Sequence, residues 1–404
     1  MDTGNTTWIM TSAALVVFMV PGLALFYGGM SRSKNMLNML MMNMVCLGIV
    51  PIVWYVAGYT LSSTGTNGFI GSFDHLFFSG ISITGEDGGA TLRDAFFALT
   101  FASITPALIS GAVADRMKFS AWLVFVPAWL LLVFVPAWAW VFRPEIGWLN
   151  ARGSLDFAGG TVVHVAAGAA SLAMVLVLGK REGWQHEPMM PHNLPFTMLG
   201  AGILWFGWFG FNAGSAFAAD GVAVQAFANT FLAAAAAMLA WLLVEKLVDG
   251  HPTSLGGASG IVAGLVGITP AAGFVGLAGA LAIGAAAGAI CALAIRLKFR
   301  YGFDDALDVV GVHFVGGLTG GVLIGLFASP ATLGGTFHAG IIDGGGAGLL
   351  GEQLLANLVV MAYSFVVTFA LAKVLDLAIG LRVSAEDERR GLDSTQHAET
   401  AYNA

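Results

Sequence analysis

The chain has 404 residues, of which 57% are hydrophobic and only 10% are charged. Soluble domains carry about a quarter charged residues, so this composition excludes a soluble globular protein and indicates an integral protein of the lipid bilayer. The formal net charge is −7, and the few basic residues fall in short loops between apolar runs, so no nucleic-acid partner is expected.

Apolar runs long enough to cross about 30 Å of hydrocarbon recur along the whole chain. They predict an all-α polytopic membrane protein with eleven transmembrane helices. In chain order, the runs fall near residues 7–29, 36–61, 92–113, 119–142, 156–179, 195–217, 222–245, 255–273, 274–295, 305–328 and 348–380.

The runs divide as five, five and one. An odd number of helices in each half gives the halves opposite orientations, which is typical of transporters built from inverted repeats. We therefore expect a transmembrane domain over residues 1–380, with pseudo-repeats at about 7–179 and 195–328 and an extra helix at about 348–380. The polar tail, 381–404, follows it.

The distribution of basic residues predicts the orientation of the helices. Of the 17 Lys and Arg residues, only Arg93, Arg143 and Arg152 lie outside the membrane if the N-terminus is outside. Loops rich in Lys and Arg stay in the cytoplasm. The chain is therefore expected in the cell membrane with its N-terminus outside and its C-terminus in the cytoplasm.

The fifth run opens with "DFAGGTVVH", which places Asp156 and His164 in one apolar segment. On a continuous α-helix the two residues are about 12 Å apart along the axis and about 80° apart around it. Asp156 then lies near the outer interface, where a carboxylate can cap the helix, and His164 lies near the middle of the membrane. An ionisable group at that depth normally faces a cavity or a partner.

The sixth run contains "ILWFGWFGFNAGSAF", in which Trp208, Phe211 and Ser215 share one stripe at i, i+3 and i+7 spacing. Aromatic faces attract a cation that has lost its water, and a serine hydroxyl can accept a hydrogen bond from it. The alternative is that the stripe only packs against neighbouring helices.

The tenth run begins near Asp308, which is expected to cap it, and carries His313. Measured from opposite sides of the membrane, His164 and His313 reach the same depth, so the two imidazoles could touch. Such a pair can line an apolar pore or relay a proton without placing a fixed charge in it. The alternative is that each histidine is a satisfied packing residue.

Several of these stretches resemble the Amt/Rh ammonium transporter family, in particular its bacterial-type Amt branch. The resemblance covers almost the whole chain. It rests on "LFYGGMSRSKNMLNMLM" (25–41), "DFAGGTVVHVAAGAASLAMVLVLGKR" (156–181), "WFGFNAGSAF" (208–217), "DVVGVHFVGG" (308–317) and "GLRVSAEDERRGLDSTQHAETAY" (380–402).

The resemblance implies roles for individual residues. His164 and His313 are similar to the twin histidines of the family's pore, and Trp208 to its pore-lining tryptophan. Phe101 and Phe211 resemble the stacked pair that closes the pore from outside.

Phe101 and two further residues resemble those of the family's outer recruitment site. Ser215 and Phe101 are expected to contact the ammonium ion there, and Asp156 is expected to support the site without touching it. The family usually adds a tryptophan in a stretch like "HWVWGGG". Here "PAWAWVFRPEIGW" (136–148) puts Phe142 at that position, while Trp140 or Trp148 could reach the same space.

The function implied is an ammonium or ammonia transporter that also accepts methylammonium as an analogue. Ammonium is recruited at an outer vestibule and loses a proton, and ammonia passes the apolar pore. The alternative is an ammonium sensor that signals through the tail. The resemblance also implies a homotrimer with one pore in each subunit, and a PII-type signal protein that docks on the cytoplasmic face.

A membrane enzyme that uses the histidines as metal ligands is a third possibility. The sequence offers no third ligand at usable spacing, so no enzymatic activity, metal or cofactor is expected.

Overall fold

The computed structural model describes residues 2–84, 86–330 and 335–402. Over these ranges the chain is helical, and no β-strand longer than an isolated bridge occurs. The predicted all-α class is therefore confirmed.

The first half of the chain forms five membrane-length segments, some of them built from consecutive helices. Their elements are α1 (Thr3–Met30), η1 (Ser33–Asn35), α2 (Met36–Val53), η2 (Trp54–Gly58), α3 (Tyr59–Ser63), η3 (Leu76–Phe78), α4 (Glu86–Val113), α5 (Phe119–Trp129), η4 (Leu130–Phe134), α6 (Val135–Phe142), η5 (Gly160–Val165) and α7 (Ala166–Leu178).

The second half repeats this plan and adds one long helix and a short helical tail. Its elements are α8 (Leu194–Gly214), α9 (Gly221–Val248), α10 (Ser254–Ile268), α11 (Leu277–Ala294), α12 (Leu297–Tyr301), η6 (Val310–Phe314), α13 (Val315–Phe327), α15 (Gly348–Ile379), α16 (Ala385–Arg390) and α17 (Leu392–His397).

Among the described residues, ten segments are long and apolar enough to cross a membrane, and α10 is a shorter apolar helix. The predicted runs therefore correspond to helices, and the chain is a multi-pass membrane protein. Some boundaries differ, and the run predicted over 255–273 is helical only as far as Ile268. Pro270 follows Thr269, and because proline has no backbone N–H it cannot continue the helical hydrogen bonds.

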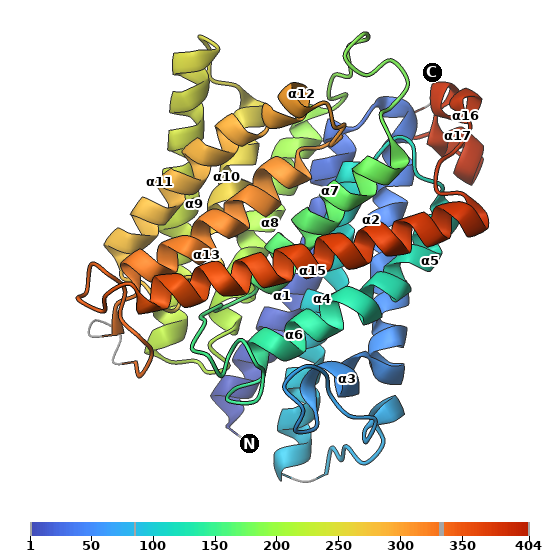
Figure 1. The fold of residues 1–404 in the computed structure, drawn as a ribbon. Coiled ribbons are helices and arrows are strands. Elements are labelled where there is room, and N and C mark those ends of the chain that lie inside the picture. Colours follow the sequence, from blue (N-terminus) through green and yellow to red (C-terminus); the bar gives the residue numbers. More distant parts are fainter. Residues whose placement is uncertain (1, 85, 331–334, 403–404) are drawn as a thin grey trace.

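The two halves make matching contacts. Helix α1 packs on α2 and α4, and α8 packs in the same way on α9 and α10. Helices α4 and α7 are in contact, as are α10 and α13, and α1 packs directly against α8 between the halves. The long helix α15 crosses one side of the bundle over α13, α7 and α5, and the two chain ends lie at opposite ends of the bundle (Figure 1).

Four π-helical segments occur within the described ranges: η2 and η4 interrupt longer helices, and η5 and η6 lie at the start of theirs. A π-turn contains an extra residue, so it shifts the direction of the side chains that follow, and such turns are frequent at functional sites. Here η5 contains His164 and η6 contains His313, at matching places in the two halves.

The tail is docked on the end of the bundle where α2 begins. The Asp393 carboxylate accepts hydrogen bonds from the backbone N–H groups of Leu37 (3.0 Å) and Asn38 (2.8 Å), and Leu392 N–H donates to Asn35 Oδ1 (2.7 Å). A second contact is made by Glu388, which accepts from Arg382 and from the N–H of Glu182. These contacts link the tail to two loops on that end of the bundle.

Candidate functional site

The two histidines meet inside the bundle. The Nδ1 atoms of His164 and His313 are 3.3 Å apart, and the rings are inclined by only 23°. Both side chains are buried, with 1% and 2% of their surface exposed. Two neutral imidazoles in this arrangement share one hydrogen, so one Nδ1 donates and the other accepts.

The contacts of Tyr27 are satisfied by one assignment of the hydrogens on the two rings. Its hydroxyl is 3.1 Å from the carbonyl oxygen of Leu108 and 3.5 Å from His313 Nε2. If the hydroxyl donates to Leu108, its oxygen accepts from His313 Nε2–H, and His313 Nδ1 must then accept from His164. This assignment leaves a lone pair on His164 Nε2, a buried atom that has no hydrogen-bond partner among the described residues.

The cavity beside the histidines is narrow and apolar. Trp208 stacks on His164 at 5.4 Å and donates its indole N–H to Thr269 Oγ1 at 2.8 Å, so the indole is held in place. The cavity measures about 10 Å³, close to the minimum for one water molecule. Besides His164, His313 and Trp208, this histidine cavity is lined by Met19, Leu23, Ile104, Leu108, Val163, Leu204, Phe211 and Val262.

A second space lies at the end of the bundle where α1 begins, and a pair of phenylalanines separates it from the histidine cavity. The rings of Phe101 and Phe211 are 4.2 Å apart, with Phe101 facing one space and Phe211 the other. This aromatic hollow measures about 80 Å³, which is room for a small cation. It is lined by Phe97, Phe101, Trp138, Phe142, Phe157, Ala158, Ser215 and Phe217.

Ser215 is the one hydroxyl among the residues that line the aromatic hollow. Its Oγ donates to the carbonyl oxygen of Phe211 at 2.8 Å. Because the hydroxyl hydrogen is used in this bond, the oxygen keeps its lone pairs for a donor in the hollow.

Asp156 lies just before two residues of the hollow, Phe157 and Ala158. Its carboxylate accepts from four successive backbone N–H groups, those of residues 159–162, at 2.8 to 3.3 Å. It is therefore a capping residue, as the sequence suggests, and its oxygens are already occupied.

The fifth membrane segment, predicted over 156–179, begins as a helix only at Gly160, and its first turn is π-helical. The separation of 12 Å and 80° assumed a continuous α-helix from Asp156 and is wrong. The cause is the turn at Gly159, whose φ of 106° favours glycine, followed by Gly160, where a Cβ would collide with the ring of Pro270.

The prediction that Asp308 caps the tenth segment is also wrong. Asp305 does so, because its carboxylate accepts from the N–H groups of Val309 (3.1 Å) and Val310 (2.7 Å). Asp308 has a left-handed backbone with φ of 63°, and its carboxylate is paired with Lys298 at 2.6 Å. Three acids within five residues made the cap ambiguous in the sequence.

Of the aromatic residues proposed to complete the outer cage, Phe142 lines the hollow and the other two do not. Trp140 donates its indole N–H to the carbonyl oxygen of Phe69 and packs on Trp148 and Tyr363. Trp138, which the sequence analysis passed over, faces the hollow instead. Its spacing of four residues from Phe142 was the available signal, since i and i+4 share a helix face.

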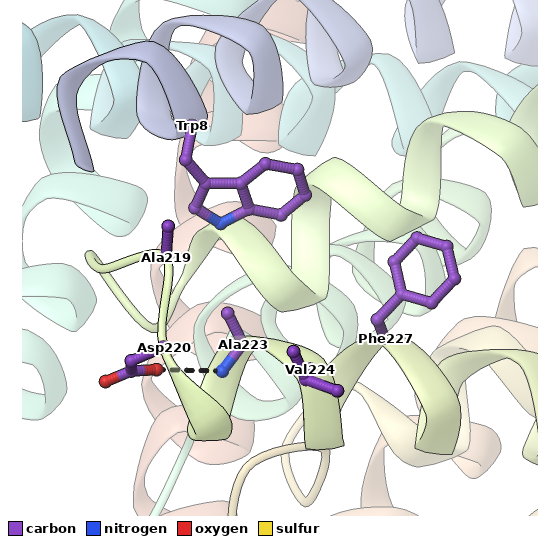
Figure 2. A pocket seen from close by; sticks show the side chains of 6 residues that line it. All are labelled: Trp8, Ala219, Asp220, Ala223, Val224 and Phe227. Carbon is purple, nitrogen blue, oxygen red and sulfur yellow. Dashed lines mark hydrogen bonds between the residues drawn. The ribbon is translucent and has the colours of Figure 1, made fainter. Parts of the chain in front are cut away.

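A larger hollow of about 300 Å³ lies elsewhere, between the start of α1 and the start of α9 (Figure 2). The figure shows Trp8 and Phe227 on its walls and Asp220 bonded to the N–H of Ala223. That carboxylate caps α9, and the other residues that line the hollow are apolar. The hollow therefore lacks the convergent polar groups of a transport site.

In the part of the chain that the structure describes, no three His, Cys, Asp or Glu side chains are close enough together to hold a metal ion. The polar groups that line the histidine cavity and the aromatic hollow are imidazole, hydroxyl and indole groups.

Comparison with known proteins gives a consistent picture. A sequence model of the Ammonium Transporter Family matches residues 7–402. An ammonium transporter from Mycobacterium tuberculosis is 48% identical over 432 residues, which cover 100% of this chain and 91% of that protein.

Two solved structures are similar to this chain. Saccharomyces cerevisiae Mep2 matches with a TM-score of 0.88 and 36% identity, over 96% of this chain and 88% of that one. A sensor Amt protein matches with a TM-score of 0.89 and 28% identity, over 98% of each chain.

Proposed function

The chain belongs to the ammonium transporter family, and we propose that it passes ammonia through the histidine cavity after ammonium has been bound in the aromatic hollow and has lost a proton to His164 Nε2. The observation that carries this proposal is the free lone pair of His164 Nε2 inside an apolar cavity. A buried nitrogen without a hydrogen-bond partner costs free energy, so a histidine that served only for packing would not leave one.

Ammonium is bound first in the aromatic hollow. Ser215 Oγ accepts one of its N–H groups, and the ring faces around it attract the positive charge. Asp156 does not touch the ion, since its oxygens bind backbone N–H groups, but its negative charge lies just behind Phe157 and favours a cation there.

Loss of a proton allows passage through the pore. A cation in an apolar cavity of about 10 Å³ meets no carboxylate and has room for about one water molecule at most, so the loss of its hydration is prohibitively costly. Ammonia is neutral and can accept a hydrogen bond from His164 Nε2 once that nitrogen carries the proton. Potassium has no proton to lose, so the same cost excludes it.

The proton has a separate route through the histidines. A proton accepted at His164 Nε2 releases the one on Nδ1 toward His313, whose Nε2 faces Tyr27. The chain of hydrogen bonds thus runs alongside the path of ammonia.

The proposal extends to topology and assembly. The N-terminus is outside and the C-terminus is cytoplasmic, so the aromatic hollow opens outward and the tail 381–404 is the regulatory element. The location of the two chain ends at opposite ends of the bundle supports this (Figure 1). The family resemblance supports a homotrimer and a PII-type partner at the cytoplasmic end.

A sensor is the second candidate, because the fold also matches a sensor Amt protein. Identity to that protein is 28%, whereas identity to the mycobacterial ammonium transporter is 48%, which favours transport. A sensor would bind ammonium without moving it.

Uptake of labelled methylammonium by cells that lack their own ammonium transporters tests the proposal. The wild-type chain should restore uptake, and His164→Ala should abolish it. His251→Ala is the matched control, because His251 is exposed in the loop after α9 and should leave uptake unchanged. Absence of uptake with the correctly inserted wild-type chain, or equal uptake by His164→Ala, would refute the proposal.

A further inference from the structure

We propose that Trp138, rather than Phe142, Trp140 or Trp148, provides the aromatic face that determines affinity for ammonium in the aromatic hollow. This inference rests on the proposed function, because it concerns the site where the cation is first bound. It assigns to the indole of Trp138 most of the attraction between the bound ammonium ion and the aromatic rings.

The direction of α6 selects Trp138 over Trp140. Residues two positions apart point to nearly opposite sides of an α-helix, whereas residues four apart share a side. Trp138 and Phe142 therefore face the hollow together, and their rings are 4.7 Å apart. Trp140 points away and is held by its hydrogen bond of 2.8 Å to Phe69.

The π-turn η4 ends at Phe134, directly before α6 begins at Val135. The extra residue in this turn sets the direction of the helix that follows. It thus determines that Trp138, and not a neighbour, reaches the hollow.

The indole of Trp138 is held rigidly. Its ring centroid lies 5.5 Å from that of Phe134, 6.0 Å from Phe101 and 6.4 Å from Trp54. Trp54 is fixed in turn by a hydrogen bond of 3.0 Å from its indole N–H to the carbonyl oxygen of Ala95. A ring that is already immobile loses little entropy when a cation binds to it, so its attraction is retained as affinity.

The other walls of the hollow offer less attraction. All the remaining aromatic residues that line it are phenylalanines, and the indole ring attracts cations more strongly than the phenyl ring. Ser215 provides one acceptor, and Asp156 is occupied by backbone N–H groups. Trp138 is therefore the strongest single source of cation attraction among the lining residues.

The experiment measures the half-saturating concentration and the maximal rate of methylammonium uptake separately. Trp138→Leu should raise the half-saturating concentration about tenfold and Trp138→Phe about threefold, with the maximal rate within about twofold of wild type. Trp140→Leu is the control of equal size change, and Phe142→Leu tests the rival position. Both should change the half-saturating concentration less than Trp138→Leu does.

Two results would overturn the inference. One is a half-saturating concentration for Trp138→Leu that stays within about twofold of wild type. The other is a loss of maximal rate in both Trp138 variants without a change in affinity, which would indicate a structural role.

Failure of the proposed function itself gives a different result, namely no uptake by the wild-type chain. In that case the purified protein still reports on Trp138, through the change in tryptophan fluorescence on adding ammonium chloride against a sodium chloride control. A fluorescence change that persists in Trp140→Phe and is lost in Trp138→Phe supports the assignment of Trp138 to the binding site. A fluorescence change that persists in both variants contradicts it.

Discussion

His164 Nδ1 and His313 Nδ1 lie 3.3 Å apart, although 149 positions separate the two residues in the sequence. Each histidine is in a π-turn that precedes a helix, and the two helices, α7 and α13, occupy matching places in the two halves. The site is therefore made by the meeting of the halves, and neither half has it alone.

Ser215→Ala tests the hydroxyl of the aromatic hollow. The substitution removes the one hydroxyl acceptor available to ammonium there, so the half-saturating concentration for methylammonium should rise about fivefold to tenfold with little change in maximal rate. Ser171→Ala is the control, because Ser171 Oγ likewise donates to the carbonyl oxygen four residues earlier but is buried in α7. Equal affinities for the two variants would exclude Ser215 from the binding site.

Tyr27→Phe tests the hydrogen-bonded chain below the histidines. Without the hydroxyl, His313 Nε2 loses its partner, and the hydrogen shared with His164 is no longer directed. The maximal uptake rate should fall about threefold to tenfold at unchanged half-saturating concentration, since the aromatic hollow is intact. A change in affinity alone would contradict this role.

Much of this arrangement could be predicted from the sequence. Long apolar runs predict membrane-spanning helices well, because a segment that crosses the membrane must satisfy all its backbone hydrogen-bonding groups internally. The meeting of His164 and His313 followed from depth alone, since ionisable groups at that depth need partners.

The remaining features depend on local backbone changes that the sequence does not signal. A π-turn has no distinctive composition, so a uniform helical period carried through η4 could not orient α6, and only the spacing of four residues between Trp138 and Phe142 pointed to Trp138. The cap by Asp305 likewise depends on the left-handed backbone of Asp308. In both cases the backbone is displaced by less than one helical turn. This displacement changes which side chain takes the role, as lining residue in the first case and as helix cap in the second.

Asp304→Ala tests the ion pairs that hold the loops at the end where the tail is docked. Asp304 pairs with Arg181 through both carboxylate oxygens, at 2.8 and 2.9 Å, and both side chains are buried. Burial opposes ionisation of Asp304, but Arg181 and Arg116 outweigh it and hold its pKa below the ordinary value. The stabilisation is therefore complete at neutral pH and is lost only in strong acid.

Removing Asp304 leaves the buried Arg181 with only its longer contact to Asp115 at 3.4 Å, so Asp304→Ala should lower the free energy of unfolding by about 3 kcal/mol. Thermal unfolding in detergent measures this. Asp249→Ala breaks the exposed pair with Arg296 and should cost at most about 1 kcal/mol. Equal melting temperatures for the two variants would show that the buried pair is not a stabilising element.

The docking of the tail should depend on pH through His397. This ring packs on Phe119 and bonds to Asn38, and burial there lowers its pKa below 6.5, an effect that Asp393 and Glu399 partly offset. The docked tail then binds fewer protons than a released one, so docking weakens as the pH falls below about 6.5. Asp393, whose pKa is raised by burial, acts in the opposite sense but at lower pH.

Hydrogen exchange of the amides of α17 measures this dependence. After correction for intrinsic rates, exchange should be faster at about pH 5.5 than at about pH 7.5, and His397→Asn should remove most of the difference. Exchange that is independent of pH in the wild-type chain would exclude the switch.

The central claim is that deprotonation at the histidines excludes ions that cannot lose a proton. The most direct measurement is the current evoked by ammonium and by potassium in proteoliposomes that contain the wild-type chain or the double variant His164→Asn, His313→Asn. Wild-type protein should respond to ammonium and not to potassium, and the double variant should either lose the ammonium response or admit potassium. A double variant that conducts ammonium as well as wild type and still excludes potassium would contradict the account.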